Sequence, residues 1–326
     1  IFTTRPDTIF GVTFMVVSSQ HPKLMELVTA KQKTEVEKFL KKLKSVSEKE
    51  LEEMEKEGVF TGSYAVSPLT KEKVPVYAGN FVVADYGSGM VMAVPGHDQR
   101  DWDFAKKYKI PIKEVVAPSF IGCPKEGVNT VERRTVTAII ENKKGDKFLL
   151  LKEPKDFIFV GGGVEKGETS EEAIKREVRE ETGYINFDIK KVLKENLFAY
   201  GYRETKGINQ KTNDTVFHIK LKNEERTKSE AEQGKHEILW INPLKIKDKI
   251  TWKHHKFMWD IFNKEQAYTS SGILINSGKF SGMNSENAIE EITKELENSN
   301  LGKKKVNYKI RDWMISRQRY WGTPIP

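Results

Sequence analysis

The sequence predicts a mixed α+β protein in which one folded block is inserted into another. Short apolar runs of strand length alternate with helical patterns along all 326 residues. The pattern of short apolar runs between turn residues in roughly the first 120 residues returns after residue 265. The residues between these two parts predict a self-contained series of strands and helices. A chain of this length has room for two or three domains, since one domain takes roughly 100–200 residues.

Composition narrows the class of protein. Hydrophobic residues make up 37% of the chain, and no apolar run approaches the roughly 18 residues of a membrane span, so we expect no membrane partner. A single cysteine, Cys123, excludes a disulfide scaffold and fits a reducing cytoplasm. The net charge of +8 favours polyanionic partners such as RNA or nucleotides, or is simply a mixed surface that tips positive. The start at Ile1, without Met or a signal peptide, is typical of a fragment.

The first part, residues 1–126, combines strands with exposed helices. Two apolar runs have strand character: Ile9–Val17 and Gly89–Val94. Between them, residues 29–57 are dense in Lys and Glu with apolar residues at helical spacing, which predicts one or two exposed helices. A short helix is expected over residues 98–108. Two Pro and two Gly over residues 117–127 then predict a linker.

The inserted block is predicted to span residues 127–264. Arg134–Glu141 and Lys147–Lys152 flank a Lys-Lys-Gly-Asp turn, which indicates a β-hairpin. The remaining elements expected in this block are two strands and a final helix: Val216–Leu221, Glu237–Ile241 and Trp252–Asn263. Beyond it, residues 265–312 complete the first part, with a strand and turn near residue 272 and a helix from Asn284 to Leu296.

One helix of the inserted block carries clustered carboxylates behind a glycine-rich loop. Thr169 and Glu172 form a capping box that starts this helix, and Gly183 ends it. Three carboxylates share one face because they lie three or four residues apart: Glu177, Glu180 and Glu181. Such a cluster is repulsive unless a cation lies within it, and oxygen ligands of this kind suit Mg²⁺. The alternative is an ordinary amphipathic surface helix.

The loop and helix together resemble the signature of the Nudix family. The pattern G-x5-E-x7-R-E-U-x-E-E-x-G-U is matched by Gly162, Glu168, Arg176, Glu177, Val178, Glu180, Glu181, Gly183 and Tyr184, the last replacing the usual aliphatic residue. The resemblance implies an α/β/α sandwich that hydrolyses a nucleotide or another diphosphate-linked compound. It further implies Mg²⁺ or Mn²⁺ held by Glu177, Glu180 and Glu181, with Glu177 catalytic. Later acidic residues are candidates for a further ligand or base: Glu230, Glu232 and Glu237.

A second interpretation of the insert stays open. It could hold tRNA or orient the flanking part without catalysis, although its complete set of glutamates counts against this.

Taken singly, the segments that flank the insert do not predict a function. Thr3–Thr8 could line a polar pocket or form a capped turn, and Gly96–Asp101 could be a loop and helix start. Together, several segments resemble the editing domain, connective peptide 1, of bacterial-type leucyl-tRNA synthetases: Thr3–Phe10, Gly58–Tyr64, Asp85–Trp102, Gly272–Gly278 and Lys305–Pro326. The resemblance implies a β-barrel-like domain, with residues 313–326 as the strand returning toward the catalytic core of a longer synthetase.

The need for editing follows from size discrimination. A pocket separates amino acids that differ by one methylene by only about 1–3 kcal/mol, so a second sieve must remove misloaded ones. The resemblance implies that this part hydrolyses mischarged tRNA(Leu), bound by its acceptor end and without a cofactor. The His-Ile-Gly-His and Lys-Met-Ser-Lys-Ser signatures are absent from the sequence, so we expect no leucine activation or tRNA charging by this chain.

The resemblance also assigns roles to single residues. Thr8 is the discriminator that excludes leucine, and Asp101 pairs with the α-ammonium group of the substrate. The remaining pocket and adenosine-site residues are Thr3, Thr4, Arg5, Tyr86, Met92, Val94 and Asp98. Because no Ser-His-Asp or Cys-His grouping is evident, we expect attack by a positioned water. Met90 and Ser88 depart from the usual Ala and Thr, which leaves the preferred non-cognate amino acid open.

Overall fold

A computed structural model describes residues 1–44, 54–82, 88–153, 156–227 and 237–305. It is a mixed α/β structure with two sheets, one of four strands and one of nine. The mixed class predicted from the sequence is confirmed. Among the described strands neither sheet closes on itself, so the barrel-like shape expected for the flanking part is not confirmed. Within the same residues, no helix has both the length and the apolar character needed to cross a membrane.

The four-stranded sheet belongs to the first part of the chain. Its strand order is β2-β3-β1-β4, with β1 parallel to β3 and the other pairs antiparallel. The bounds are β1 Phe14–Ser18, β2 Gly58–Val66, β3 Lys73–Gly79 and β4 Met90–Ala93. Phe14 and Val16 of β1 pack with Phe104 of α3 (Gln99–Tyr108), whereas Met15 and Val17 face a second core on the other side. Helix α1 (Lys33–Lys44) lies beside β2.

The start of the chain differs from the predicted strand over Ile9–Val17. A 3-10 helix, η1 (Pro6–Gly11), takes the first three residues of this run, and β1 begins only at Phe14. Pro6 stands at the first helical position, where its fixed φ favours a helical turn. The apolar run is therefore divided between two elements, and η1 carries Thr8 into the interior.

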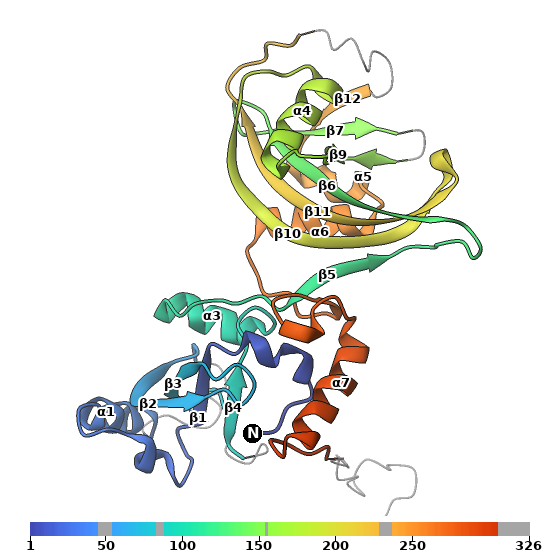
Figure 1. Cartoon of the computed structure of the whole chain (residues 1–326). Coiled ribbons are helices and arrows are strands. Elements are labelled where there is room, and N and C mark those ends of the chain that lie inside the picture. The colour runs from blue at the N-terminus through green and yellow to red at the C-terminus, as the bar shows by residue number, and fades with distance from the viewer. Residues whose placement is uncertain (45–53, 83–87, 154–155, 228–236, 306–326) are drawn as a thin grey trace, which may run out of the picture.

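The nine-stranded sheet crosses from the insert into the flanking part (Figure 1). Its main path is β12-β7-β6-β11-β10-β5-β13, and β8 and β9 pair with β7 and β6. The bounds are β5 Val116–Ile121, β6 Thr130–Glu141, β7 Phe148–Lys152, β8 Phe157–Ile158, β9 Val160–Gly163, β10 Phe187–Arg203, β11 Ile208–Leu221, β12 Glu237–Ile241 and β13 Gly272–Leu274. The strands β10 and β11 form a long antiparallel hairpin.

Helices cover the two faces of this sheet. Alternate residues of β6 point to opposite sides, so Ala138 joins a core with α4 (Ser170–Thr182) while Ile139 joins a core with α6 (Lys253–Asn263). Helix α5 (Pro243–Lys249) adds Ile246 to the second core. The sandwich implied by the Nudix resemblance stays a prediction in its details, as do the domain limits 1–126, 127–264 and 265–312.

Two segments expected to be irregular are strands. The first part of the predicted linker, residues 117–121, belongs to β5, which pairs with β13 and with β10. The glycine loop begins within β9, where Gly161, Gly162 and Gly163 pair with β6. The final helix, α7 (Ser285–Asn298), packs with η1 and β13. The predicted return strand, residues 313–326, lies outside the described residues.

Candidate functional sites

Most residues assigned to the editing pocket line one cavity of about 710 Å³ in the first part of the chain. It lies among η1, β4 and the start of α3, elements separated by some eighty residues in the sequence. The predicted residues that line it are Thr3, Thr4, Arg5, Thr8, Met92, Val94, Asp98 and Asp101. Tyr86, the remaining candidate, lies outside the described residues. Met90 and Ser88 flank the site without lining this cavity.

Asp101 is a buried carboxylate in this cavity. Helix α3 begins one turn before it, where the Asp98 side chain caps the helix by accepting the N–H groups of Arg100 and Asp101. The Oδ2 atom of Asp101 accepts the N–H of Val94 at 2.8 Å. Burial, reinforced by the neighbouring charge of Asp98, raises the pKa of Asp101 to about 7, against the opposing effect of the Val94 N–H. A cationic ligand would favour its ionised form.

Thr8 is held in a fixed position beside the same cavity. Its side chain is buried, and its hydroxyl Oγ1 donates to the Arg5 carbonyl at 2.9 Å within the turn of η1. A β-branched residue tied in this way has little rotamer freedom. Thr8 therefore presents a rigid wall, which is what exclusion by shape requires.

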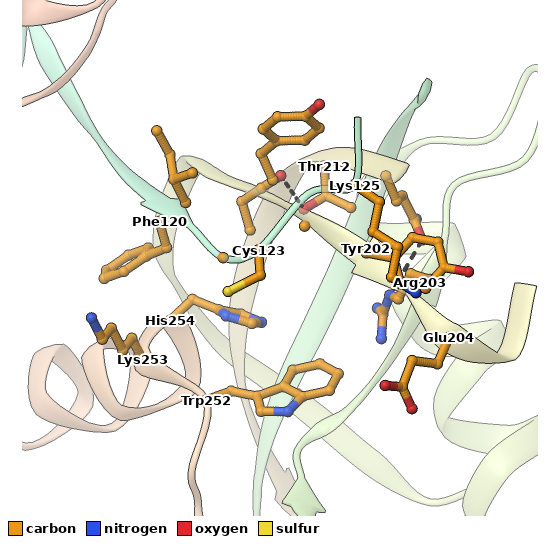
Figure 2. A pocket seen from close by; sticks show the side chains of 16 residues that line it. Phe120, Cys123, Lys125, Tyr202, Arg203, Glu204, Thr212, Trp252, Lys253 and His254 are labelled. Carbon is orange, nitrogen blue, oxygen red and sulfur yellow. Dashed lines mark hydrogen bonds between the residues drawn. The ribbon is translucent and has the colours of Figure 1, made fainter. Parts of the chain in front are cut away.

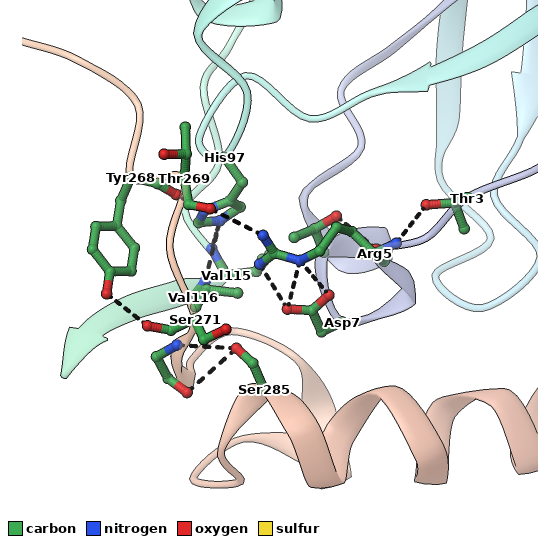
Figure 3. Close-up of polar contacts among 12 residues, drawn as sticks. Thr3, Arg5, Asp7, His97, Val115, Val116, Tyr268, Thr269, Ser271 and Ser285 are labelled. Carbon is green, nitrogen blue, oxygen red and sulfur yellow. Dashed lines mark hydrogen bonds and ion pairs between the residues drawn. The ribbon is translucent and has the colours of Figure 1, made fainter. Parts of the chain in front are cut away.

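Arg5 lines the cavity, but its charge is already neutralised (Figure 3). Its guanidinium binds the buried carboxylate of Asp7 through two N–H groups, at 2.9 and 2.8 Å. A third N–H reaches the carbonyl of Thr269 at 3.1 Å. Arg5 thus ties η1 to the chain that returns from the insert, a role that its resemblance-based assignment to the pocket wall did not include.

His97 makes a second tie at the same junction, which sequence reasoning missed. Its Nδ1 binds the Tyr268 carbonyl at 3.0 Å, and its Nε2 accepts the N–H groups of Val115 and Val116. This pattern selects the neutral ring with the proton on Nδ1, and burial lowers the pKa of His97 accordingly. With both ring nitrogens engaged, His97 fixes the frame of the cavity. The only signal in the sequence was a histidine next to a helix cap.

The carboxylate helix of the insert, α4, is organised by Arg176. The predicted capping box between Thr169 and Glu172 is present, and Gly183 ends the helix in the left-handed conformation. The guanidinium of Arg176 binds both oxygens of Glu168 at 3.0 Å, Glu177 at 2.8 Å and Glu180 at 3.1 Å. It also donates to the Gly163 carbonyl at 2.8 Å. One cation thus links the loop to two of the three glutamates.

Glu177 is the buried member of the cluster. Burial raises its pKa, while the hydrogen bond from Arg176 opposes that shift. It lies against Gly162, where a Cβ atom would come within 2.2 Å of the Glu177 carboxylate. Glu181 turns toward the sheet and accepts the N–H of Gly161 at 3.2 Å. Position 162 of the loop is therefore a glycine because the Glu177 carboxylate occupies the space that a side chain would need.

The donor chemistry of α4 fits a hard divalent cation, but the described residues do not converge as a metal site. Carboxylate oxygens are the ligands that Mg²⁺ prefers. Among the residues described here, no three acidic, His or Cys side chains gather closely enough to hold a metal ion. Glu237 begins β12 and pairs with Lys152 at 2.8 Å, and Glu230 and Glu232 lie outside the described residues. The metal role of Glu177, Glu180 and Glu181 stays a prediction.

Gly162→Ala tests the close approach of the loop to Glu177. The added methyl group would displace the Glu177 carboxylate from its hydrogen bond with Arg176, so we expect a loss of about 1–2 kcal/mol of stability while any hydrolysis by the insert falls about tenfold or more. Gly161→Ala is the contrasting variant, because its Cβ would meet the Val136 carbonyl at 2.4 Å and should destabilise the sheet. Urea unfolding together with phosphate release separates the two. Equal destabilisation by both variants would contradict this account.

Comparison with known proteins identifies both parts. The family model "Leucyl-tRNA synthetase, editing domain" matches residues 1–142, and the NUDIX domain model matches residues 131–261. Leucine–tRNA ligases of Fervidobacterium nodosum and Citrifermentans bemidjiense are 34% and 31% identical over 328 aligned positions, which cover 100% of this chain. The chain spans 23% of the length of these relatives.

A crystal structure of an Agrobacterium radiobacter K84 LeuRS–tRNA–LeuAMS ternary complex is 37% identical over 35% of this chain and 14% of that one, with a TM-score of 0.32. The two family matches show that the chain carries a leucyl-tRNA synthetase editing domain and a NUDIX domain.

Proposed function

We propose that the first part of the chain hydrolyses mischarged aminoacyl-tRNA(Leu) and spares leucyl-tRNA(Leu). The observation that carries this proposal is the shared cavity, in which a rigid Thr8 and a buried Asp101 lie together. The acceptor end of tRNA(Leu) is the partner, and the rest of a synthetase supplies further contacts. We keep a cytoplasmic location as part of this proposal, since a lone exposed cysteine fits a reducing compartment.

The chemistry requires placement more than activation. The ionised carboxylate of Asp101 would bind the substrate α-ammonium group, which orients the ester carbonyl within the cavity. Thr8 would occupy the space that the leucine branch needs. A water held against this carbonyl then attacks it directly, because an aminoacyl ester is labile enough for positioning and exclusion to provide most of the rate.

Thr8→Ala is expected to let leucyl-tRNA(Leu) enter and be hydrolysed. Removing the hydroxyl and methyl groups opens the wall of the cavity, so deacylation of the cognate ester should rise at least tenfold. The measurement compares leucyl-, norvalyl- and isoleucyl-tRNA(Leu) with wild-type protein and the variant. Thr61→Ala is the matched control, because its buried hydroxyl also donates to a backbone carbonyl, that of Val76 at 2.8 Å, but Thr61 lies on β2 and does not line this cavity. A Thr8→Ala protein that still spares leucine would show that the discriminator is another residue.

We propose a second activity for the insert, the hydrolysis of a diphosphate-linked nucleotide compound with Mg²⁺ or Mn²⁺. The NUDIX match and the set of glutamates gathered by Arg176 support it. A bound metal would clamp phosphate oxygens and lower the pKa of an attacking water. Glu177, Glu180 and Glu181 would hold it, and Arg176 keeps Glu177 oriented until it arrives. Dinucleoside polyphosphates are the first substrates to try.

The competing interpretation is that the insert holds tRNA or orients the editing part without catalysis. Titration with Mn²⁺, monitored by calorimetry, separates the catalytic from the structural interpretation, because a catalytic insert should bind Mn²⁺ at α4. Loss of that binding in Glu180→Gln would support the catalytic proposal, and absence of binding in wild-type protein would favour the structural one.

A further inference from the structure

A second cavity, of about 590 Å³, lies on the α6 side of the large sheet (Figure 2). Three segments build it: the tip of the β10–β11 hairpin, the chain just after β5, and the start of α6. Its main side chains are Tyr202, Arg203, Gln210, Thr212, Trp252 and His254. The size falls within the range of small-molecule sites, roughly 300–1,000 Å³. None of these residues belongs to the Nudix signature.

Aromatic rings and cations alternate around this cavity. The guanidinium of Arg203 lies 4.9 Å from the Trp252 ring centre, and the Lys125 ammonium lies 3.9 Å from that of Tyr202. The guanidinium of Arg203 donates to Gln210 at 3.3 Å and is influenced by the charge of Glu153, and the carboxylate of Glu204 lines the same cavity. A cavity of this kind suits a ligand in which a flat aromatic ring is joined to an anionic group, because the ring can stack on the aromatic side chains and the anion can pair with a cation.

The wall of the cavity is fixed before any ligand arrives. Asn209, buried near the tip of the hairpin, accepts the N–H of Lys125 at 2.9 Å and donates to its carbonyl at 2.8 Å. The N–H of Gly122 donates to the Tyr200 carbonyl at 2.7 Å. These bonds attach the chain after β5 to the hairpin, so the cavity includes backbone from both parts of the protein and does not depend on a free loop.

Strand register connects this cavity to Arg133 and to the glycine loop that precedes the carboxylate helix. Thr212 of the cavity is paired with Arg133 on β6, and the guanidinium of Arg133 lies against Gly163 on β9. Paired residues of neighbouring strands share a face, and two strand spacings amount to about 10 Å. Gly163 in turn accepts a hydrogen bond from Arg176. By this register Arg133 lies with the cavity on the α6 face of the sheet, and its charge also acts on Glu177 of α4, the helix that covers the opposite face.

We propose that this cavity binds the nucleoside end of a nucleotide, with the ring against Trp252 and Tyr202 and the first phosphate beside Arg203. A second phosphate would then extend past Arg133 toward α4. This inference rests on the proposed diphosphate hydrolysis for its meaning, because it assigns the recognition of that substrate to residues outside the Nudix signature. The binding itself can be tested separately from turnover.

The test uses AMP, which has no diphosphate bond to cleave, and isothermal titration calorimetry. AMP should bind more tightly than adenosine or ribose 5-phosphate, because each of these lacks one half of the recognised group. Trp252→Ala and Arg203→Ala should each weaken AMP about tenfold or more, whereas Trp252→Phe keeps a ring and should keep most of the affinity. Trp102→Ala is the matched control, since it removes a Lys–Trp contact of 5.1 Å on α3, far from this cavity.

The single cysteine gives a second readout that needs no substitution. Cys123 is exposed and lines the cavity, so AMP should slow its alkylation by iodoacetamide severalfold. Slower alkylation and weaker binding in the two Ala variants would support the proposal. Unchanged alkylation, or AMP binding that Trp252→Ala leaves intact, would overturn it. AMP binding that persists in a protein without hydrolytic activity would refute only the diphosphatase, and normal hydrolysis by Trp252→Ala would refute only the cavity.

Discussion

Replacing Asp101 by Asn is expected to abolish deacylation of mischarged tRNA(Leu) and, at the same time, to make the folded chain more stable at pH 8. The amide can still accept the Val94 N–H that Asp101 accepts at 2.8 Å, so the helix start should be kept. It cannot pair with a substrate ammonium group. Loss of one partner of a buried charge pair corresponds to roughly 10²–10³-fold in rate, which a deacylation time course resolves.

The gain in stability follows from the sign of the pKa shift. The pKa of Asp101 is about 7 in the folded chain and 3.8 in the unfolded chain, so the folded state holds this proton more tightly. The stabilisation of the fold by the protonated Asp101 side chain is fully present below about pH 4. It is lost as the pH rises through about 7, where Asp101 ionises in the folded chain. A difference of about three pKa units corresponds to about 4 kcal/mol, so Asp101→Asn should raise the free energy of unfolding by about 2–4 kcal/mol at pH 8.

Urea unfolding at pH 5 and pH 8 measures this effect. The advantage of Asp101→Asn should be larger at pH 8, and wild-type deacylation should rise as Asp101 ionises near pH 7. Asp103→Asn is the control, because Asp103 lies on the same helix but is exposed and only accepts the Gln99 amide. A variant that is less stable at both pH values, or that deacylates normally, would refute the assignment of Asp101 to the ammonium site.

Local signals were predictable from the sequence because they act over one turn. The capping box of Thr169 and Glu172 is where the pattern placed it, and the short helix predicted from residue 98 begins there, with Asp98 as its cap. Strand pairing is different, because it depends on a partner far along the chain. The segment after Val116 has the Pro and Gly content of a linker, yet β10 and β13 pair with it and make it a strand. In the same way, the three glycines of β9 have the composition of a loop, and only their pairing with β6 makes them part of a strand.

The sites show the same division. The cavity collects residues of Thr3–Thr8 and Val94–Asp101 that the resemblance had already grouped, although it could not show the partners that hold them. Arg5 reaches Thr269 across 264 positions, and no spacing rule foresees such a contact. Arg176 is named by the Nudix pattern, but its partners are not. It binds Glu168, Glu177 and Glu180 together, because the loop folds back over the helix.

Glu177→Gln is expected to remove hydrolysis by the insert while leaving the fold intact. The amide has the shape of the carboxylate and can still accept the Arg176 hydrogen bond at 2.8 Å. Burial disfavours the charge of Glu177, as its raised pKa indicates, so the neutral side chain should cost little stability or none. What the variant lacks is the negative charge that would attract a divalent cation.

A loss of about 10³-fold in Mg²⁺-dependent product release is expected, equivalent to about 4 kcal/mol of transition-state stabilisation. The assay offers a panel of dinucleoside polyphosphates and nucleotide sugars, with Mg²⁺ or Mn²⁺, to wild-type protein and the variant. Glu171→Gln is the matched control, because Glu171 lies on the same helix but is exposed and pairs only with Lys175. Because Arg176 already occupies one oxygen of Glu177, a metal must share this carboxylate with it, and the variant measures whether that sharing supports turnover. If wild-type protein and Glu177→Gln are equally inactive across the panel, the glutamates of α4 hold Arg176 and the loop in place, and the insert acts by binding alone.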